Sequence, residues 1–337
     1  MRAFLHLLVL SLATVTTIGA PQKVIIDTDF GIPPQDDALA VLLALKAPQL
    51  EIVGFTTVMG NWSLEQATVD LLRVLEITEN EQIPVYVGAN MPLVHRKSDF
   101  AVQSYGEWYS DAPPKMPPGG FATTKARDDS ASDFLIRAVK ANPGEITIIA
   151  LGPLTNLAIA LRQDPAFAAA VKRLVIMGGA IASLPDGAGN LTPNAEFNFW
   201  VDPEAADIVL RSGIEMELSP LNVSRKTRFT RQHFEELTRP DTAISRLLRE
   251  TMGPIYANSD RTYFMYDQVA VASVIDPTLV TTEEMIVSVD TQPGVGYGTS
   301  VGGRQPWPGS DGAGQIRVQY DLEWDRFIRM FIDSLNR

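Results

Sequence analysis

The chain has 337 residues, of which 45% are hydrophobic and 20% charged, and these proportions are typical of a globular protein with a substantial core. Its formal net charge of -12 disfavours nucleic acid and anionic membrane surfaces as partners. Cysteine is absent, which excludes disulfides, thiol nucleophiles and thiolate metal sites, and the three histidines are too dispersed in the sequence to suggest a zinc site.

The first residues have the pattern of a secretory signal peptide. Arg2 supplies positive charge, residues 4–17 are predominantly apolar, and residues 18–20 are suited to cleavage. A buried first helix is the alternative, but the segment has no polar face, and it is too short for a convincing membrane span. We therefore expect residues 1–20 to be a signal peptide and residues 21–337 to form one exported domain, periplasmic or secreted, that is not attached to a membrane after cleavage.

Strand-like apolar runs alternate with helix-like segments along most of the chain. This alternation predicts βαβ units, and therefore an α/β fold with an open, mostly parallel sheet covered by helices on both faces (Rossmann-like) in a single domain. In such folds the ligand binds beyond the carboxyl ends of the strands. In chain order, the predicted strands are residues 24–26, 52–57, 85–87, 146–150 and 173–177, and the predicted helices are residues 38–44, 64–75, 130–140, 156–162 and 203–212.

Two segments interrupt the alternation. Residues 112–120 are rich in proline and glycine and follow Tyr105, Trp108 and Tyr109, so this region is either a lid over a site or an inert excursion. Residues 294–314 contain eight glycines but no GxGxxG pattern between a strand and a helix, and we expect a loop there rather than a phosphate-binding turn.

Four aspartates lie between the first predicted strand and the first predicted helix: Asp27, Asp29, Asp36 and Asp37. Carboxylates held together at such a turn repel one another unless a cation lies between them, and oxygen ligands suit a hard divalent ion such as calcium. A solvated acidic loop is the alternative, but apolar runs flank the segment on both sides. Asp29 closes the strand and Asp37 begins the helix, which makes them the best candidates for metal ligands.

Polar residues follow most of the other predicted strands. Asn61 follows one strand, the Leu151 carbonyl ends another, and Met177 ends a third before two glycines. Residues 190–203 interleave amides and a carboxylate with aromatic side chains, a composition that suits a polyhydroxylated sugar, and Asp267 precedes an apolar run that is either helix or strand. Each of these segments by itself is more often a turn or a helix cap, but together they indicate a site.

The chain resembles the nucleoside hydrolases, also called inosine-uridine preferring nucleoside hydrolases, from about Val24 to a C-terminal helix at residues 321–327. The resemblance implies an N-ribosyl hydrolase that uses one Ca²⁺ ion to cleave ribonucleosides into ribose and free base. It also implies that the subunits associate as dimers or tetramers. The segments that carry it are the Asp-rich turn and residues 56–61, 152–156, 177–179, 196–198 and 202–203.

The resemblance assigns roles to residues at the matching positions. It makes Asp29 a calcium ligand and the general base that activates a calcium-bound water, with Asp37, Asp267 and the Leu151 carbonyl as the other protein ligands of calcium. Asp27 has no matching role, and we expect it to support the residues that bind the metal without binding the metal itself. The residues expected to bind the nucleoside are Asp36, Asn61, Asn190, Glu196 and Asn198 at the ribose hydroxyls, Met177 and Phe197 along the sugar, and Tyr266.

Two features depart from the family pattern. The spacing DxDxGxDD is lengthened here by three residues, 33–35, and Tyr266 stands where many members have the histidine that protonates the leaving base. Because tyrosine is a poor acid at neutral pH, the base could be activated by aromatic stacking instead. The candidates for stacking are Trp62, Trp108, Trp200 and Tyr266.

Two other functions compete with the hydrolase. An exported nucleoside-binding protein would have lost catalysis through the longer turn. A Mg²⁺-dependent phosphatase of the Asp-x-Asp type would use Asp27 and Asp29, but the adjacent pair Asp36 and Asp37 would have no role in it.

Overall fold

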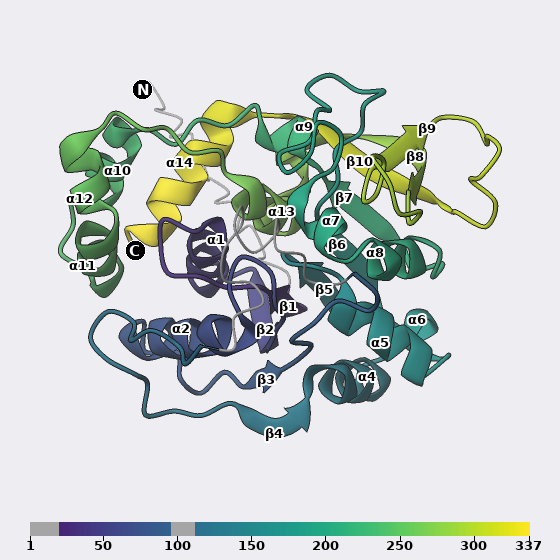
Figure 1. Ribbon diagram of the computed structural model, residues 1–337. Coiled ribbons are helices and arrows are strands. Elements are labelled where there is room, and N and C mark those ends of the chain that lie inside the picture. The colour runs from purple at the N-terminus through teal and green to yellow at the C-terminus, as the bar shows by residue number, and fades with distance from the viewer. Residues whose placement is uncertain (1–19, 96–111) are drawn as a thin grey trace, which may run out of the picture.

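The computed structural model describes residues 20–95 and 112–337 (Figure 1). The signal peptide expected at residues 1–20 therefore lies almost entirely outside the described residues, as do Tyr105, Trp108 and Tyr109 of the possible lid. Within the two described ranges, no helix is both long and apolar enough to cross a membrane.

One ten-stranded sheet forms the centre of the molecule, in the order β4-β3-β2-β1-β5-β6-β7-β10-β8-β9. Neighbouring strands are parallel from β4 through to β10, and β8 is antiparallel to both β10 and β9. The predicted α/β fold with a mostly parallel sheet is confirmed. The strands are β1 Gln22–Thr28, β2 Leu50–Thr57, β3 Val85–Val87, β4 Arg127–Ser130, β5 Thr147–Ala150, β6 Arg173–Met177, β7 Met216–Ser219, β8 Val280–Val289, β9 Ser300–Gly303 and β10 Gln315–Leu322.

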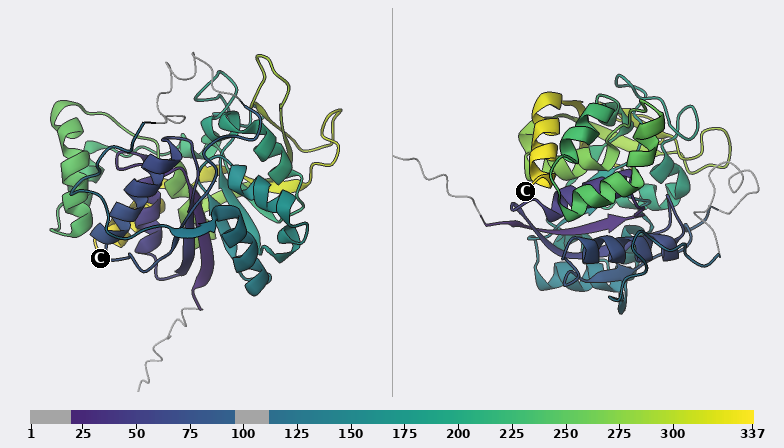
Figure 2. Two further views of the ribbon diagram at one scale, coloured as in Figure 1. Left: turned by 60° about the horizontal axis from the view of Figure 1, so that its bottom comes forward. Right: turned by 90° about the vertical axis from the view of Figure 1, so that its left-hand side faces the viewer.

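Helices cover both faces of this sheet (Figure 2). Side chains of successive β1 residues enter opposite cores: Val24 and Ile26 pack with α1, α13 and α14, whereas Ile25 packs with α4, α5 and α8. A central strand buried on both faces explains the continuous apolar run before the aspartates. The helices are α1 Asp36–Leu45, α2 Leu64–Ile77, α4 Ala131–Ala141, α5 Thr155–Gln163, α6 Phe167–Ala170, α7 Phe197–Val201, α8 Pro203–Leu210, α9 Leu221–Ser224, α10 Arg231–Leu237, α11 Ala243–Thr251, α12 Gly253–Asn258, α13 Tyr266–Ile275 and α14 Trp324–Leu335.

The structure corrects two expectations near the C-terminus. The glycine-rich segment 294–314 is not all loop, because it contains β9, which pairs with β8. The C-terminal helix begins at Trp324 rather than at residue 321, since Asp321 and Leu322 still belong to β10. The run after Asp267, for which helix and strand were both open, is the helix α13.

The lengthened turn between β1 and α1 is packed against its surroundings. The indole of Trp62 lies so close to Gly31 that a Cβ there would overlap it, and the Lys115 ammonium lies 5.7 Å from the centre of the Trp62 ring. Asp70 of α2 accepts a hydrogen bond from the Gln66 side chain (2.9 Å), and the Ile32 backbone lies within hydrogen-bonding reach of its carboxyl. Of the three added residues, Pro33 is buried, and the Gln35 N–H donates to the Ile32 carbonyl at 3.2 Å, so they do not form a free loop.

Asp70 makes the stability of this region depend on pH. Burial raises the pKa of Asp70 from 3.8 to about 6, so the folded state favours the protonated carboxyl. Stability from this group is present below about pH 4 and is lost as pH rises through about 6. We expect Asp70→Asn to gain about 2–3 kcal/mol of unfolding free energy relative to the wild type between pH 4 and pH 7, measured by urea denaturation.

Glu76 provides a control of opposite sign. Hydrogen bonds from Thr124 and Thr123 lower the pKa of Glu76 to about 2, so its contribution is present above about pH 4.5 and is lost in acid. Glu76→Gln should therefore lose stability relative to the wild type as pH rises from 2 to 5. A difference between Asp70→Asn and the wild type that stays constant from pH 4 to 7 would contradict the assignment.

Candidate active site

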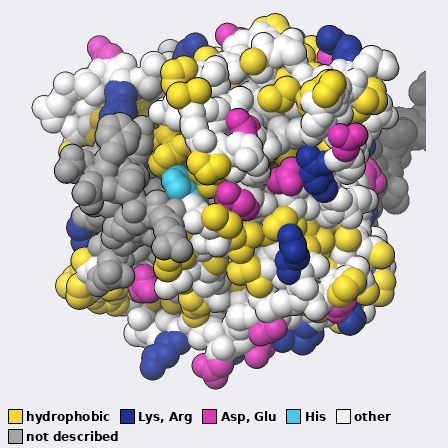
Figure 3. All heavy atoms as spheres, turned by 45° about the vertical axis from the view of Figure 1, so that its right-hand side comes forward, with side chains coloured by type: hydrophobic (Ala, Val, Ile, Leu, Met, Phe, Trp, Pro, Cys, Tyr) yellow, Lys and Arg dark blue, Asp and Glu magenta, His cyan; other side chains and the backbone are white. Residues whose placement is uncertain are grey.

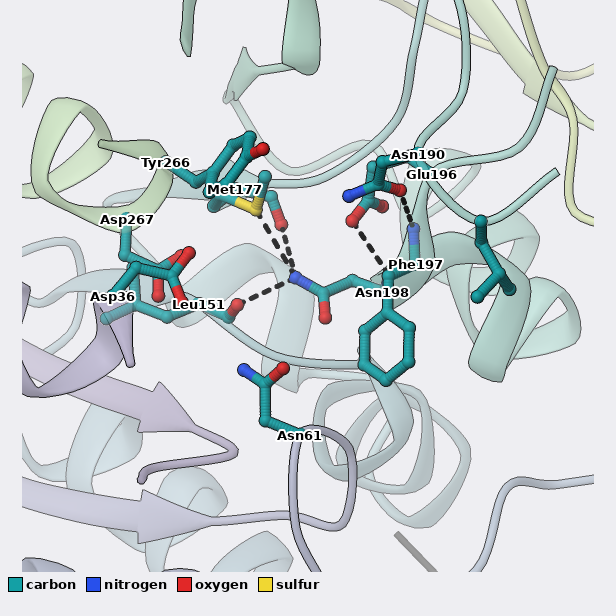
Figure 4. A pocket seen from close by; sticks show the side chains of 11 residues that line it. Asp36, Asn61, Leu151, Met177, Asn190, Glu196, Phe197, Asn198, Tyr266 and Asp267 are labelled. Carbon is teal, nitrogen blue, oxygen red and sulfur yellow. Dashed lines mark hydrogen bonds between the residues drawn. The ribbon is translucent and has the colours of Figure 1, made fainter. Parts of the chain in front are cut away.

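A cavity of about 250 Å³ lies at the carboxyl edge of the central strands (Figure 4). The strands β2, β1, β5 and β6 are neighbours in the sheet and parallel, so the residues that follow them meet at this edge. Ten of the twelve predicted site residues line the cavity. The lining residues are Asp36, Asn61, Leu151, Met177, Asn190, Leu191, Glu196, Phe197, Asn198, Tyr266 and Asp267.

Carboxylates gather at the floor of this cavity. Oxygen atoms of Asp36, Asp37 and Asp267 all lie within 4.8 Å of one another. Asp36 and Asp37 begin α1 and Asp267 lies in the first turn of α13, and these two helices pack against each other. The other two predicted calcium ligands are close by: the Asp29 carboxyl is within hydrogen-bonding reach of Asp37, and the Leu151 carbonyl lines the cavity.

Asp29 is fully buried and held from three sides. A Cβ at Gly60 or Gly152 would overlap its carboxylate, so the absence of side chains at these two positions provides its space. The Asn61 backbone N–H donates to Asp29 Oδ2 at 2.6 Å. Asp29 Oδ1 has no hydrogen-bond partner among the described residues, and neither does Asp267 Oδ1.

Burial and mutual repulsion disfavour the ionised forms of these acids. The pKa values of Asp29 and Asp267 are raised well above the usual range by burial and then by neighbouring carboxylates, and the pKa of Asp36 is raised to about 7 for the same reasons. Unpartnered buried oxygens next to other carboxylates are the surroundings that a cation would stabilise. The donor set consists of oxygen atoms and therefore fits a hard ion such as Ca²⁺.

Neighbouring side chains hold the carboxylates in place. The Asp37 carboxylate accepts hydrogen bonds from the Thr28 hydroxyl and from Asn61 Nδ2 (2.9 Å). Gln268 Nε2 donates to the backbone carbonyl of Asp36 at 3.1 Å. Neither Thr28 nor Gln268 was predicted from the sequence, although each is adjacent in sequence to a predicted ligand.

Asp27 is hydrogen-bonded to residues of β2 and α5. Its Oδ1 accepts from the Thr56 hydroxyl (2.5 Å) and from Asn156 Nδ2 (2.7 Å), while Asn156 Oδ1 accepts from the Ala89 backbone at 2.8 Å. This network joins β1 and β2 to the start of α5. Asn156 ends one of the segments that carried the family resemblance, and its side chain connects β1 to the chain that follows β3.

The wall opposite the acids is built around α7. Glu196 caps this helix: its Oε1 accepts from the Asn198 backbone (2.8 Å), and its Oε2 accepts from the backbones of Gly179 (2.9 Å) and Phe199 (3.0 Å). Asn198 Nδ2 donates to the Leu151 carbonyl at 2.8 Å. Asn190 is exposed, and its Oδ1 accepts from the Phe197 backbone at 2.9 Å. Leu191 also lines this wall, and no pattern in the sequence indicated it.

The four stacking candidates have different surroundings. Tyr266 lines the cavity, and burial followed by the nearby Asp36 raises its pKa to about 12, so it is a poor acid here. Trp62 packs against the lengthened turn. Trp200 lies edge-on to His95, with ring centres 4.5 Å apart, and lines a second cavity. Trp108 lies outside the described residues.

Fold and site together define an α/β protein with a small-molecule cavity that combines a cluster of acids with amide and apolar walls. Comparison with known sequences identifies it further: residues 24–329 match the family described as inosine-uridine preferring nucleoside hydrolase, and the chain belongs to this family. Its members are N-glycosyl hydrolases, and the resemblance noted in the sequence is confirmed.

Curated relatives span nearly the whole chain. Uridine nucleosidase 1 of Arabidopsis thaliana is 38% identical over 304 residues, which cover 87% of this chain and 86% of the relative. The pyrimidine-specific ribonucleoside hydrolase RihB of Escherichia coli is 31% identical over 308 residues, which cover 90% of this chain and 94% of the relative.

Solved structures of nucleoside hydrolases share the fold. A plant nucleoside hydrolase, PpNRh1, superimposes with a TM-score of 0.79 at 33% identity, covering 94% of this chain and 99% of that one. A purine-preferring ribonucleoside hydrolase from Gardnerella vaginalis gives a TM-score of 0.77 at 27% identity, covering 94% and 98%. The names of these proteins differ in base preference: the Gardnerella vaginalis protein is called purine-preferring, whereas the Escherichia coli relative is called pyrimidine-specific.

Proposed function

We propose that the protein hydrolyses the N-glycosidic bond of ribonucleosides to ribose and free base with one bound Ca²⁺, and that it prefers uridine and other pyrimidine nucleosides. Family membership supports the reaction, and the names of the two curated relatives support the pyrimidine preference. The observation that carries the mechanism is Asp29 Oδ1, a buried oxygen without a hydrogen-bond partner beside the acid cluster.

In this proposal Asp29 acts as the general base. Its Oδ2 is held by the Asn61 backbone, so its Oδ1 remains to take a proton from an attacking water. Asp29, Asp37, Asp267 and the Leu151 carbonyl would hold the ion. Calcium, when bound, orients water and lowers its pKa.

The remaining lining residues act on the sugar. Leaving of the base builds positive charge on the ribose ring, as in glycoside hydrolysis, and the carboxylates beneath the ring stabilise that charge. Met177 and Phe197 provide apolar surface for the ring carbons. The residues that would hydrogen-bond the ribose hydroxyls are Asp36, Asn61, Asn190, Glu196 and Asn198.

The leaving base is activated without a histidine acid. Because the pKa of Tyr266 is raised to about 12, its hydroxyl stays protonated at neutral pH and would donate a hydrogen bond to the base rather than transfer a proton. Family membership favours neither the binding-protein alternative nor the phosphatase.

Export and association of subunits are further parts of the proposed function. Residues 1–20 would direct export and be removed, leaving residues 21–337 as an exported, periplasmic or secreted, enzyme. This enzyme would act on a free nucleoside as a homodimer or homotetramer. The formal net charge of -12 disfavours nucleic acid as a partner. On the face shown in Figure 3, acidic and basic side chains are interspersed.

Ribose release from a panel of nucleosides tests the reaction and the base preference together. With Ca²⁺ present, kcat/KM for uridine should exceed that for inosine by about 10-fold or more, because the two bases fill the pocket differently. 2′-Deoxyuridine should be poorer than uridine by about 100-fold or more, since groups built to bind a hydroxyl would lose their partner.

Each outcome of this panel separates one claim from another. Preference for inosine would contradict the pyrimidine assignment and leave the hydrolase intact. Tight binding of uridine without ribose release would favour the binding protein. Release of phosphate from p-nitrophenyl phosphate without ribose release would favour the phosphatase.

A further inference from the structure

The C-terminal part of the segment between β6 and α7 forms one wall of the cavity. Within it, the Gly189 N–H donates to the Pro193 carbonyl (2.9 Å) and the Asn190 N–H donates to the Ala195 carbonyl (3.2 Å), so residues 189–195 form a compact turn. Asn190 and Leu191, both lining the cavity, lie in that turn. We call residues 181–195 the wall loop.

Two side chains on and just after the short helix α9 hold the first half of the wall loop. Asn222 Nδ2 donates to the carbonyls of Ile181 (3.0 Å) and Pro185 (2.7 Å), and Asn222 Oδ1 accepts from the Ile181 N–H (2.9 Å). Asn222 is fully buried. In Figure 1 the loop rises beside α9.

Arg225 extends this support to the cavity. Its Nη1 donates to the carbonyls of Asp186 (2.7 Å) and Ala188 (2.5 Å), and its Nη2 donates to the Gly189 carbonyl (2.9 Å). Gly189 directly precedes Asn190. One guanidinium therefore holds three carbonyls of a segment that has no regular secondary structure.

The three bonds use the particular geometry of arginine. A planar guanidinium presents several N–H donors in a fixed fork, whereas a lysine ammonium offers three donors on a flexible chain. The guanidinium reaches the edge of the cavity, because Gly189, whose carbonyl it binds, directly precedes the lining residue Asn190. No arginine or lysine is among the residues that line the cavity in the described parts of the chain.

We propose that Arg225 is a positioning residue for substrate binding. It fixes the wall loop so that Asn190 and Leu191 stay in place in the cavity wall, where they would contact the nucleoside. Arg225 does not touch the acids that carry out the chemistry. This inference rests on the proposed function, since it assigns a role in binding the nucleoside that the site would cleave.

The test is a comparison of KM with kcat for uridine. Arg225→Ala should raise KM by about 10-fold or more, the effect of losing hydrogen bonds from a charged donor, while kcat changes by less than about 3-fold. Arg225→Lys should recover part of the affinity. An Arg225→Ala enzyme with normal KM, or with kcat reduced and KM unchanged, would overturn the proposal.

Arg211→Ala is the matched control. Arg211 also holds a backbone carbonyl of a glycine-containing loop, that of Asp311, and it pairs with Asp207, but neither residue lines the proposed active site. Its KM for uridine should equal that of the wild type even if the melting temperature falls. A raised KM in this control would show that loss of stability alone explains the Arg225 result.

A double-mutant cycle shows whether Arg225 acts through the wall loop. In an Asn190→Ala background, Arg225→Ala should raise KM by much less than in the wild type, because the two changes remove the same contact. Multiplicative effects would refute action through Asn190. If the wild type released no ribose, the proposed function would fail, and the same series measured as uridine Kd by calorimetry would still decide the role of Arg225.

Discussion

Asp29→Asn is expected to lower kcat for ribose release by about 10²- to 10⁴-fold, the usual contribution of a general base. The amide keeps the size of the side chain and can still accept from the Asn61 backbone, but it cannot take a proton from water. The pocket formed by Gly60 and Gly152 accommodates it equally well. Stopped and continuous assays of ribose release, with the melting temperature as a check on folding, measure the effect.

The control for Asp29→Asn is an aspartate-to-asparagine change outside the cavity. Asp207→Asn removes a carboxylate of α8 that pairs with Arg211 and does not line the cavity. This change should leave kcat within about 3-fold of the wild type, as for surface substitutions. An Asp29→Asn enzyme with comparable activity would exclude Asp29 as the base. A loss of uridine affinity with unchanged kcat would instead assign it to substrate binding.

Removal of calcium is expected to abolish turnover and to destabilise the fold. Asp29, Asp36, Asp37 and Asp267 are crowded at one point, and without a cation their repulsion is uncompensated. A ligand that binds the folded state at 100 times its Kd contributes about 2.7 kcal/mol of stability, so the melting temperature should fall by several degrees on chelation. Because protons compete for the same oxygens, the apparent calcium affinity should fall as pH falls below 7.

The calcium experiment needs a measured metal content. Activity lost to a chelator should return with Ca²⁺, and Asp267→Asn should shift the Ca²⁺ concentration for half-maximal activity upward, whereas Asp207→Asn should not. Full activity in protein shown by elemental analysis to contain no divalent metal would contradict the proposal. If Mg²⁺ but not Ca²⁺ restored activity, the metal site would be supported, but its ion would be Mg²⁺ rather than Ca²⁺.

The gathering of the predicted residues around one cavity could be foreseen because strand ends in a parallel sheet meet at one edge. Asn61, Leu151 and Met177 are distant in sequence, yet each follows or ends a neighbouring strand, so alternation of strands and helices was enough to bring them together. Most predicted elements agree with the observed ones to within a few residues for the same reason, since their apolar runs are long or fully buried.

Contacts that depend on loop conformation could not be predicted. The bonds from Arg225 to the wall loop join residues 36 to 39 positions apart in sequence and depend on backbone carbonyls, which all residues share. Strand β9 was missed because Ser-Val-Gly-Gly carries no alternating pattern and is a strand through its pairing with β8. Trp62 looked like a base-stacking residue, and its place against Gly31 is set by tertiary packing.

The packed turn between β1 and α1 bears on how relatives of this protein are recognised. Asp29 belongs to the end of a strand and Asp37 to the start of a helix, and each position is determined by its own element. The chain between them can therefore vary in length, provided that the longer version finds support, as it does here from Trp62 and α2. A search pattern with fixed spacing across the turn would miss this protein, whereas a pattern anchored separately on the strand end and the helix start would find it.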